Sequence, residues 1–348
     1  MATENDTFTG WAGVSKDEPL QQMQLTLKQW DEDSVEMKIT HCGICGSDDY
    51  TLKSLWGATN YPCVVGHEIV GVVTRVGKNV TNLKVGDRAG VGAQCGSCHE
   101  CSSCKDSEEN CCYKMSGTYN SKWPNGDKTY GGYADKWRGD YRFAFKVPDS
   151  LPSEIAATFF CAGVTTYAPL RRTNVNEKSV VGIMGIGGLG HYGILWAKAM
   201  GAKVVGMSSS DSKRDVALEL GCHEFVNTSD EKALESYKGQ LTHILCTGCG
   251  PDFTWEKYLT LLKRKGTFIN VNAPSWTFPP LKPMLLIGTQ ANICGSLIGS
   301  PKEIEEMLQF AAEKNVRPWI DVFPMKDVNK VLEDFRAGKP RFRFVLEN

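Results

Sequence analysis

The sequence predicts an α/β protein in which one domain is a doubly wound parallel sheet and the other is a β-barrel. One indication is the glycine loop at 185–190, which follows a short apolar run and precedes a helical pattern. A second is the alternation of strand and helix patterns after about Lys178, which is typical of a parallel sheet. A third is the earlier part of the chain, where glycines interrupt short β-branched runs.

The N-terminal part is expected to supply the strands of the barrel. Strands are predicted at 69–76 and 80–91, and a helical stretch at 153–160 follows two prolines. The tail at 341–346 predicts a last strand, which we expect to return to this first domain and make it discontinuous. The expected boundaries are 1–158 for the first domain with a cysteine-rich lobe at 95–112, 159–296 for the second, and 297–348 for the return.

The second domain begins with an apolar run at 180–184, which suits a buried parallel strand. The glycine loop follows, and Gly201 is placed to end the helix after it. Ser300 and Glu303 form a predicted capping box around a proline at the first helical position. The remaining strands of this domain are expected at 203–207, 225–226, 244–246 and 268–271.

Composition places the chain among ordinary globular proteins. Of its 348 residues, 41% are hydrophobic and 23% are charged, and a net charge of -1 gives no reason to expect a nucleic acid or an anionic membrane as partner. No apolar run approaches a membrane span, and the polar N-terminus lacks the features of a secretory signal. We therefore expect a cytoplasmic protein whose fourteen cysteines include metal ligands rather than disulfides.

A compact cluster of cysteines predicts a closed metal site. Cys98, Cys101, Cys104 and Cys112 are spaced C-x2-C-x2-C-x7-C. Four thiolates form a tetrahedral zinc site that leaves no position for substrate. A set that began three residues earlier would need a glutamate as its fourth ligand, so the first set is favoured. This zinc is expected to stabilise the lobe rather than take part in catalysis.

A second candidate metal set has an open position. Cys45, His67 and Cys161 offer two thiolates and one imidazole, and such a set leaves the fourth zinc position free. Each residue alone is weak evidence, but the lobe and the glycine loop support the set, and together the three features indicate hydride transfer at an alcohol or aldehyde. The other cysteines are expected to be small buried residues; they are Cys42, Cys63, Cys95, Cys111, Cys222, Cys246, Cys249 and Cys294.

The run Gly66-His67-Glu68-x2-Gly71-x5-Gly77-x2-Val80 resembles the zinc-containing alcohol dehydrogenase signature of the medium-chain dehydrogenase/reductase superfamily. The resemblance covers nearly the whole chain. The stretches 91–94, 161–163 and 341–344 are most similar to NADP-dependent cinnamyl alcohol dehydrogenases, including the broad-specificity fungal type. The resemblance implies a GroES-like catalytic domain, a Rossmann cofactor domain, two zinc ions per chain and a homodimer paired through edge strands near 292–297.

The resemblance also implies roles for residues beside the open metal set. Ser47 corresponds to a hydroxyl that binds the substrate oxygen and starts a proton relay, and Asp48 to a carboxylate that orients the metal-binding histidine. Glu68 has two interpretations, a transient ligand or tuner of the metal and a paired structural carboxylate. Tyr50 stands where many members carry histidine, so the last relay step is open to water, to Ser47 with the cofactor ribose alone, or to Asp49.

The cofactor is predicted to be NADP(H). NAD-specific sites carry a carboxylate after the second strand, and here that position falls on Ser209, which can donate to a 2′-phosphate instead. Lys213 and Arg214 supply positive charge nearby, whereas Asp211 is expected to be a helix cap that faces solvent. The expected cofactor residues are Gly185, Ile186, Gly187, Gly188, Leu189, Gly190, Ser208, Ser209, Ser210 and Lys213, and by resemblance Thr165, Thr247, Asn272, Ser296, Leu297 and Ile298.

Aromatic residues suggest the substrate class. Trp56 matches an aromatic position of the fungal subgroup, and Tyr61 and Tyr119 are further pocket candidates that are equally open to being core. The expected activity is reduction of aryl, allylic or medium-chain aldehydes such as cinnamaldehyde. One alternative is a reductase of specialised metabolism that acts on a natural-product enal or iminium. Another is a catalytically silent zinc protein that binds NADPH, against which the complete open metal set argues.

Overall fold

The computed structural model describes residues 6–274 and 276–348. The chain forms two compact units: the first contains the chain up to Val164, Gly299–Asn315 and Trp319–Asn348, and the second contains Thr165–Ile298 and Val316–Pro318. The first boundary falls after the expected residue 158, because Cys161 lies against Cys45 of the first unit. Within the described residues, no helix has both the length and the apolar character needed to cross a membrane.

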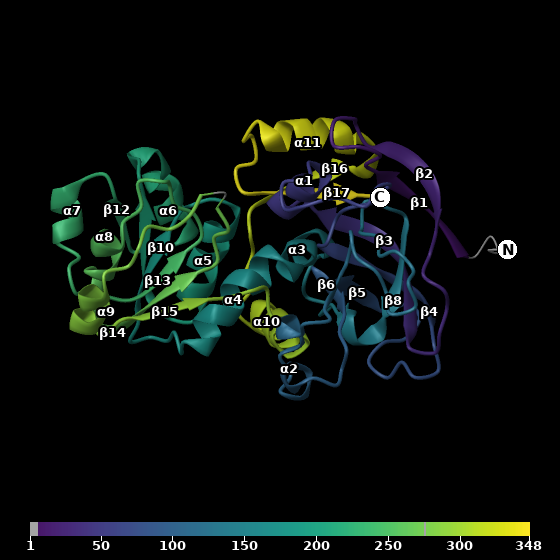
Figure 1. The fold of residues 1–348 in the computed structure, drawn as a ribbon, viewed down its shortest axis with the longest axis horizontal. Helices are drawn as coiled ribbons and strands as arrows, with labels where there is room; N and C mark the ends of the chain where they lie inside the picture. The colour runs from purple at the N-terminus through teal and green to yellow at the C-terminus, as the bar shows by residue number, and fades with distance from the viewer. Residues whose placement is uncertain (1–5, 275) are drawn as a thin grey trace. The chain divides into compact units, whose positions relative to one another are not determined.

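A seven-stranded sheet organises the first unit. The C-terminal strand β17 pairs antiparallel with β3, so that Val345 lies opposite Gly43, and Figure 1 shows this yellow segment among the strands of the N-terminal part. The last strand therefore lies in the first unit. The order is β16 (Ile320–Pro324), β17 (Arg343–Glu347), β3 (Ser34–Gly43), β4 (Ile69–Val76), β5 (Arg88–Val91) and β9 (Phe145–Lys146), with β8 (Lys136–Asp140) paired to β3.

Shorter elements surround this sheet. A hairpin of β1 and β2 and a small pair of β6 and β7 are separate from it, and five α-helices among the described residues belong to the same unit. Their bounds are β1 (Thr7–Ala12), β2 (Gln21–Thr26), β6 (Gln94–Gly96), β7 (Ser116–Gly117), α1 (Gly46–Leu52), α2 (Ser102–Lys105), α3 (Ser153–Ala157), α10 (Pro301–Glu313) and α11 (Val328–Arg336).

Two predicted elements of the first unit are shorter than expected. The strand predicted at 80–91 is present only from Arg88, because the amide of Asp87 donates to the carbonyl of Lys84 and Gly86 has a φ of +91°. The helix predicted at 153–160 ends at Ala157 and continues as a 3-10 turn. A short local pattern does not distinguish such turns from the element beside them.

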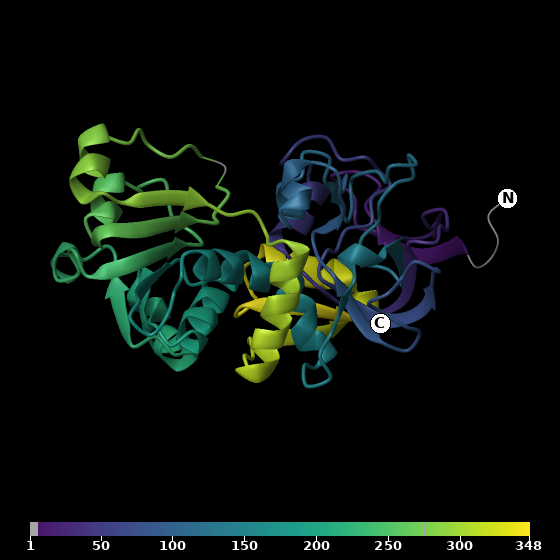
Figure 2. The same ribbon diagram turned by 90° about the horizontal axis from the view of Figure 1, so that it is seen from below.

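The second unit is a six-stranded parallel sheet whose strands alternate with helices along the chain. Figure 2 shows the strands and helices of this unit in teal and green. In the strand order β12-β11-β10-β13-β14-β15, the first strand along the chain, β10, lies inside the sheet. The chain continues to β11 on one side of β10 and later to β13 on its other side. Its strands are β10 (Val180–Met184), β11 (Lys203–Ser208), β12 (Glu224–Asn227), β13 (Leu241–Cys246), β14 (Leu262–Asn270) and β15 (Asn292–Gly295). Its helices are α4 (Ala162–Arg172, which begins in the first unit), α5 (Gly188–Ala199), α6 (Arg214–Leu220), α7 (Glu231–Glu235), α8 (Trp255–Leu259) and α9 (Pro283–Thr289).

Local chemistry explains where several helices begin and end. Gly221 follows α6 with a φ of +117°, a left-handed conformation that suits glycine at a helix end. The predicted capping box of α10 is present, because Ser300 Oγ accepts from the Glu303 amide at 3.4 Å and the Glu303 carboxylate accepts from the Ser300 amide at 2.9 Å. The buried side chains of α10 are the predicted apolar stripe: Ile304, Met307, Leu308 and Ala311.

Candidate functional site

Four side chains of the first unit converge on one point. One donor atom from each of Cys45, His67, Glu68 and Cys161 lies within 4.8 Å of the others. Cys45 is the N-cap of α1, His67 and Glu68 directly precede β4, and Cys161 directly precedes α4. Three segments that are distant in the sequence therefore bring the predicted open metal set together.

The carboxylate of Asp48 organises this cluster from behind. Asp48 is fully buried, and its Oδ1 lies 3.0 Å from Nδ1 of His67 and accepts from the Gly66 amide at 3.0 Å. Its Oδ2 accepts from the Cys45 amide at 2.9 Å and from the Tyr133 hydroxyl at 3.2 Å. Because Asp48 accepts the proton of Nδ1, the lone pair of the imidazole is on Nε2.

The free ring nitrogen of His67 is the clearest sign of a missing partner. Nε2 is buried and has no hydrogen-bond partner among the described residues. The sulfur atoms of Cys45 and Cys161 lie 3.9 Å apart beside it. A buried polar atom without a partner is costly, so two sulfur donors and one such nitrogen form the set that a zinc ion satisfies.

Glu68 pairs with an arginine that the sequence analysis did not assign to the site. A guanidinium nitrogen of Arg343 contacts Oε1 of Glu68, while Oε2 is buried without a hydrogen-bond partner. Burial raises the pKa of Glu68 to about 7, and the charge of Arg343 opposes this rise. Glu68 is thus a paired carboxylate that also keeps one oxygen free. Arg343 lies in the last strand, so only the return of that strand reveals it.

The thiols of the cluster influence one another. Contact with the thiol of Cys161 lowers the pKa of Cys45, and the positive charge of Arg343 lowers it further. The same contact and burial raise the pKa of Cys161. A cation at this point would favour both thiolates.

Other predicted residues beside the cluster have different surroundings. The hydroxyl of Ser47 lies 3.7 Å from Sγ of Cys45. Tyr50 is partly exposed and makes an edge-to-face contact with Trp56, at a ring distance of 5.1 Å, and Trp56 is 58% exposed. Asp49 pairs with Arg336 at 2.6 Å, so it is not a free carboxylate.

The two predicted pocket tyrosines differ from each other. The hydroxyl of Tyr61 donates to the Leu52 carbonyl at 2.6 Å, and its ring packs against the core of the first unit. The hydroxyl of Tyr119 lies 2.9 Å from Nδ1 of His67. Tyr119 thus contacts a side chain of the metal cluster, a relation that the sequence pattern does not reveal.

The cysteine lobe gathers a second set of four sulfurs. One sulfur from each of Cys98, Cys101, Cys104 and Cys112 lies within 4.8 Å of the others. The competing Cys95 is buried, and its thiol donates to the Gly117 carbonyl at 3.3 Å. The free cysteines outside the two clusters are mostly buried, as expected, with three corrections: Cys111 is exposed, and Cys249 and Cys294 are partly exposed.

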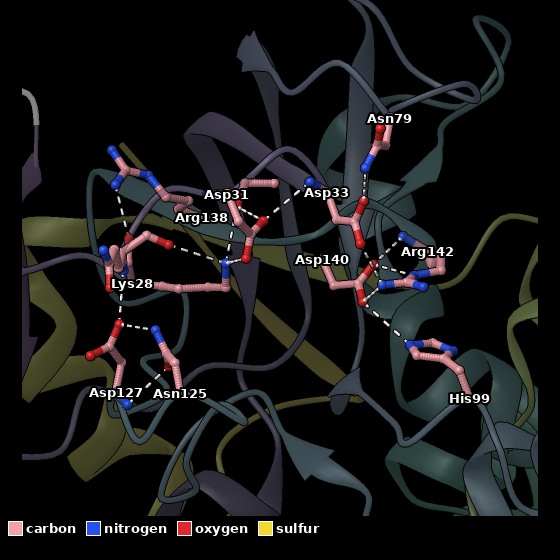
Figure 3. A network of polar contacts seen from close by, with 12 residues as sticks. Lys28, Asp31, Asp33, Asn79, His99, Asn125, Asp127, Arg138, Asp140 and Arg142 are labelled. Atoms are coloured by element: carbon pink, nitrogen blue, oxygen red, sulfur yellow. Dashed lines mark hydrogen bonds and ion pairs between the residues drawn. The ribbon is translucent and has the colours of Figure 1, made fainter.

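A polar network ties this lobe to strand β8 of the seven-stranded sheet (Figure 3). Nε2 of His99 lies 3.4 Å from the carboxylate of Asp140, which also pairs with Arg142 at 2.7 Å. Further along β8, the buried Arg138 donates to the Lys28 carbonyl at 2.9 Å. His99 lies between two cysteines of the lobe, so the contact fixes the cluster to the sheet that carries the open metal set.

The glycine loop of the second unit connects β10 to α5. Gly185 has a φ of +86°, and a Cβ atom at Gly190 would collide with the Gly185 carbonyl. Gly187 is the N-cap of α5, and the space around a Cβ placed there is open. Ile186 is buried, while Gly188 and Leu189 begin the helix. The loop leaves helix amides accessible at the carboxyl end of the sheet, which is the geometry of a pyrophosphate site.

The predicted phosphate-binding residues follow β11 at the same edge of the sheet. Ser208 ends β11, and Ser209 and Ser210 are exposed beyond it. Lys213 is exposed and has no acidic partner within the described part of the chain. One sequence expectation is wrong here: Ser210, rather than Asp211, caps the following turn.

The carboxylate of Asp211 is occupied by other groups. It accepts from Arg214 at 2.6 Å and from the Asn227 amide group at 2.8 Å. Arg214 is thus engaged by the carboxylate of Asp211, whereas the ammonium group of Lys213 can still contact a phosphate.

The remaining predicted cofactor residues lie at several points of the second unit. Thr247 donates to the Met184 and Gly185 carbonyls at 3.0 and 2.7 Å, so its hydroxyl holds the glycine loop. The side chain of Asn272 donates to Sγ of Cys249 at 3.4 Å. The others are Thr165 in α4, and Ser296, Leu297 and Ile298 after β15.

Comparisons agree with both halves of this arrangement. The family model described as "Alcohol dehydrogenase GroES-like domain" matches residues 31–149, and the one described as "Zinc-binding dehydrogenase" matches residues 188–313. An NADP-dependent alcohol dehydrogenase of Mycolicibacterium smegmatis is 40% identical over 344 residues, which cover 98% of both proteins. A cinnamyl alcohol dehydrogenase from Sorghum bicolor has a TM-score of 0.92 and 36% identity, with 98% of this chain and 97% of that chain covered.

The structure of a third relative contains a cofactor. The cinnamyl alcohol dehydrogenase of Helicobacter pylori, solved in complex with NADP(H), has a TM-score of 0.89 and 32% identity, with 98% of each chain covered. An identity of 40% over nearly the whole length establishes common ancestry. The chain therefore belongs to the zinc-binding alcohol dehydrogenase family, with a GroES-like domain followed by a zinc-binding dehydrogenase domain.

Proposed function

We propose that this enzyme uses zinc and NADP(H) to interconvert alcohols and aldehydes, and that it works mainly as a reductase of aryl, allylic or medium-chain aldehydes. The observation that carries the proposal is the buried, unpartnered Nε2 of His67 beside the sulfurs of Cys45 and Cys161. The relatives named NADP-dependent or cinnamyl alcohol dehydrogenase support the reaction and the cofactor.

Cys45, His67 and Cys161 are the proposed ligands of a catalytic zinc. A zinc ion held by these residues would polarise the substrate oxygen, and NADPH would supply the hydride. Asp48 keeps the proton on Nδ1 of His67 and thereby keeps Nε2 available as a donor. Glu68 is a paired carboxylate whose free oxygen tunes the charge of the cluster.

Proton transfer is assigned to Ser47. Its hydroxyl lies beside Cys45, so it is placed to hydrogen-bond the substrate oxygen and to pass the proton of the alcohol group. Tyr50 is partly exposed and suits a relay through water, whereas Asp49 is paired with Arg336 and is not proposed as a base. The exposed Trp56 is the proposed aromatic contact for substrate.

NADP(H) selectivity is assigned to Ser208, Ser209, Ser210 and Lys213. Serine hydroxyls donate to a 2′-phosphate and Lys213 adds positive charge, while no carboxylate stands at position 209 to repel the phosphate.

The cysteine lobe is the proposed structural zinc site. The strand β15 lies at the edge of its sheet and exposes Ile293, which supports pairing of two copies into a homodimer. The free cysteines suit a reducing cytoplasm.

The direct test replaces one proposed ligand. Cys161→Ala is expected to lower zinc content from two ions per chain to one and to abolish cinnamaldehyde reduction, while NADPH binding in the second unit persists. Cys63→Ala is the matched control, because Cys63 is a buried free thiol of the same unit outside the cluster. Full activity in Cys161→Ala would reject the ligand assignment. NADPH binding without turnover of any aldehyde, enal or iminium would favour the silent binding protein.

A further inference from the structure

A pair of neighbouring thiols, Cys246 and Cys249, lies outside both metal clusters. Strand β13 ends at Cys246, and the chain continues with Thr247, Gly248 and Cys249. Sγ of Cys246 lies 3.8 Å from Sγ of Cys249. A disulfide bond is about 2.05 Å long, so rotation of the side chains must bring the sulfurs less than about 2 Å closer.

The two thiols have unequal surroundings. Cys246 is fully buried, whereas Cys249 is partly exposed and accepts a hydrogen bond from the amide group of Asn272 at 3.4 Å. Contact with Cys246 lowers the pKa of Cys249, and the amide of Asn272 lowers it further. The same contact, together with burial, raises the pKa of Cys246. In thiol–disulfide exchange, Cys249 is therefore the thiol that attacks an external disulfide, and Cys246 is the thiol that then displaces the bound partner from the mixed disulfide.

The pair stands at the point of the sheet where dinucleotides bind. β13 is the neighbour of β10 on the side opposite β11, so the order of the strands reverses between them. In open α/β sheets the ligand binds outside the carboxyl ends of the strands at this reversal. Cys246 is the residue at that end of β13, and Gly185 directly follows that end of β10.

The residues between the two cysteines hold the glycine loop. Thr247 donates to the Met184 and Gly185 carbonyls through its hydroxyl, and the Gly248 amide donates to the Met184 carbonyl at 3.2 Å. A Cβ atom at Gly185 would stand only 2.7 Å from the Gly248 carbonyl oxygen. Backbone is thus in direct contact with backbone, and a change in the turn between the cysteines shifts the first residue of the loop.

We propose that Cys246 and Cys249 form a redox-active dithiol whose closure to a disulfide weakens NADP(H) binding at the adjacent glycine loop. This inference rests on the proposed function, because it assumes that the cofactor binds there. The oxidant is a small-molecule disulfide such as oxidised glutathione. The Cys249 thiolate attacks one sulfur and releases one glutathione, and Cys246 then attacks the mixed disulfide and releases the second. Two protein thiols are oxidised, one disulfide is reduced, and the two thiol protons end on glutathione.

Peptide mapping reports the closure without any cofactor. Trypsin is expected to release residues 239–257, which contain both cysteines and no others. In zinc-loaded enzyme equilibrated with oxidised and reduced glutathione, this peptide should become two hydrogens lighter and resistant to alkylation. Cys249→Ser should abolish the change. The control is Cys294→Ser, which removes another partly exposed thiol of the same unit and should leave the closure unaltered.

NADPH affinity reports the coupling. Fluorescence titration of the oxidised enzyme should give a Kd about tenfold higher than that of the reduced enzyme, within the usual range of coupling between sites. Cys249→Ser should bind NADPH equally well before and after oxidation. Because linkage is reciprocal, saturating NADPH should raise the reduction potential of the pair by about 30 mV, the equivalent of tenfold for two electrons.

The outcomes separate this inference from the proposed function. If the reduced enzyme binds NADPH but the peptide never closes, or closes with unchanged affinity, the dithiol proposal alone is overturned. If the reduced enzyme does not bind NADPH, both proposals are overturned. Closure that persists in Cys249→Ser through another cysteine would also reject the assignment of this pair.

Discussion

The hydroxyl of Tyr119 lies 2.9 Å from Nδ1 of His67, the ring nitrogen that faces away from the metal cluster. The same nitrogen lies 3.0 Å from Asp48, so two groups fix the orientation of one proposed ligand. Burial and the charge of Asp48 raise the pKa of Tyr119, which keeps the phenol neutral. Tyr119 is therefore a positioning residue rather than an acid or base.

Tyr119→Phe should weaken binding of the catalytic zinc about tenfold, the lower end of the effect known for groups that orient metal ligands. Competition with a chelator measures this affinity. Tyr130→Phe is the matched control, because Tyr130 packs against the core of the same unit and its ring contacts Phe8. Equal zinc affinities in Tyr119→Phe and the native enzyme would show that Asp48 orients His67 alone.

Cys104→Ser should remove the zinc of the lobe and leave the catalytic zinc in place. Loss of one thiolate from a four-thiolate site releases the metal and unfolds the lobe that it closes. Metal analysis should therefore find one zinc per chain in place of two, with a lower thermal midpoint. Cys111→Ser removes a neighbouring exposed thiol outside the cluster and should keep two ions. Two ions in Cys104→Ser would contradict the assignment.

Ser209→Asp combined with Lys213→Ala should move cofactor preference towards NADH. The change adds a carboxylate that repels a 2′-phosphate and removes a lysine that has no acidic partner in the described part of the chain. The ratio of kcat/KM for NADPH to that for NADH should fall by at least about tenfold. Lys263→Ala, which removes another exposed lysine of the same unit, is the control. An unchanged ratio would reject the phosphate assignment.

The stability of the second unit should decrease in acid partly through His243. Burial lowers the pKa of His243, and its Nε2 donates to the Thr173 carbonyl at 3.1 Å. Below about pH 6.5 the imidazole of His243 binds a proton more readily in the unfolded protein than in the folded one. The free energy of unfolding therefore decreases as the pH is lowered. His243→Gln keeps a donor but does not titrate, so it should lose less stability between pH 7 and 5.5 in denaturant titrations. Parallel losses in the two proteins would contradict this effect.

Regular patterns predicted most of the fold. The strand at 180–184, the capping box before α10 and the strand at the C-terminal end depend on local apolar periodicity or capping chemistry, and all are present. The strand expected at 80–91 failed because the turn at Lys84 to Asp87 interrupts a run whose composition still resembles a strand. Composition over a short window does not report where a backbone turns.

The contacts that only the folded structure reveals join segments that are distant in the sequence. Neither the pairing of Arg343 with Glu68 nor the approach of Tyr119 to His67 has a local signal, because each joins residues far apart in the sequence. Asp211 was assigned to a cap from its position before a helix, but Arg214 and Asn227 occupy its carboxylate instead. Spacing identified the donor sets, whereas their supporting groups depend on the folded structure.

The most direct test of the account is the initial rate of NADPH oxidation, and separately of NADH oxidation, with cinnamaldehyde and zinc-loaded enzyme. We expect rapid turnover with NADPH and at least about tenfold lower kcat/KM with NADH, because Ser209 and Lys213 are the proposed partners of the 2′-phosphate. Absence of turnover with either cofactor would contradict the proposed reaction, and equal rates with both would contradict the cofactor assignment.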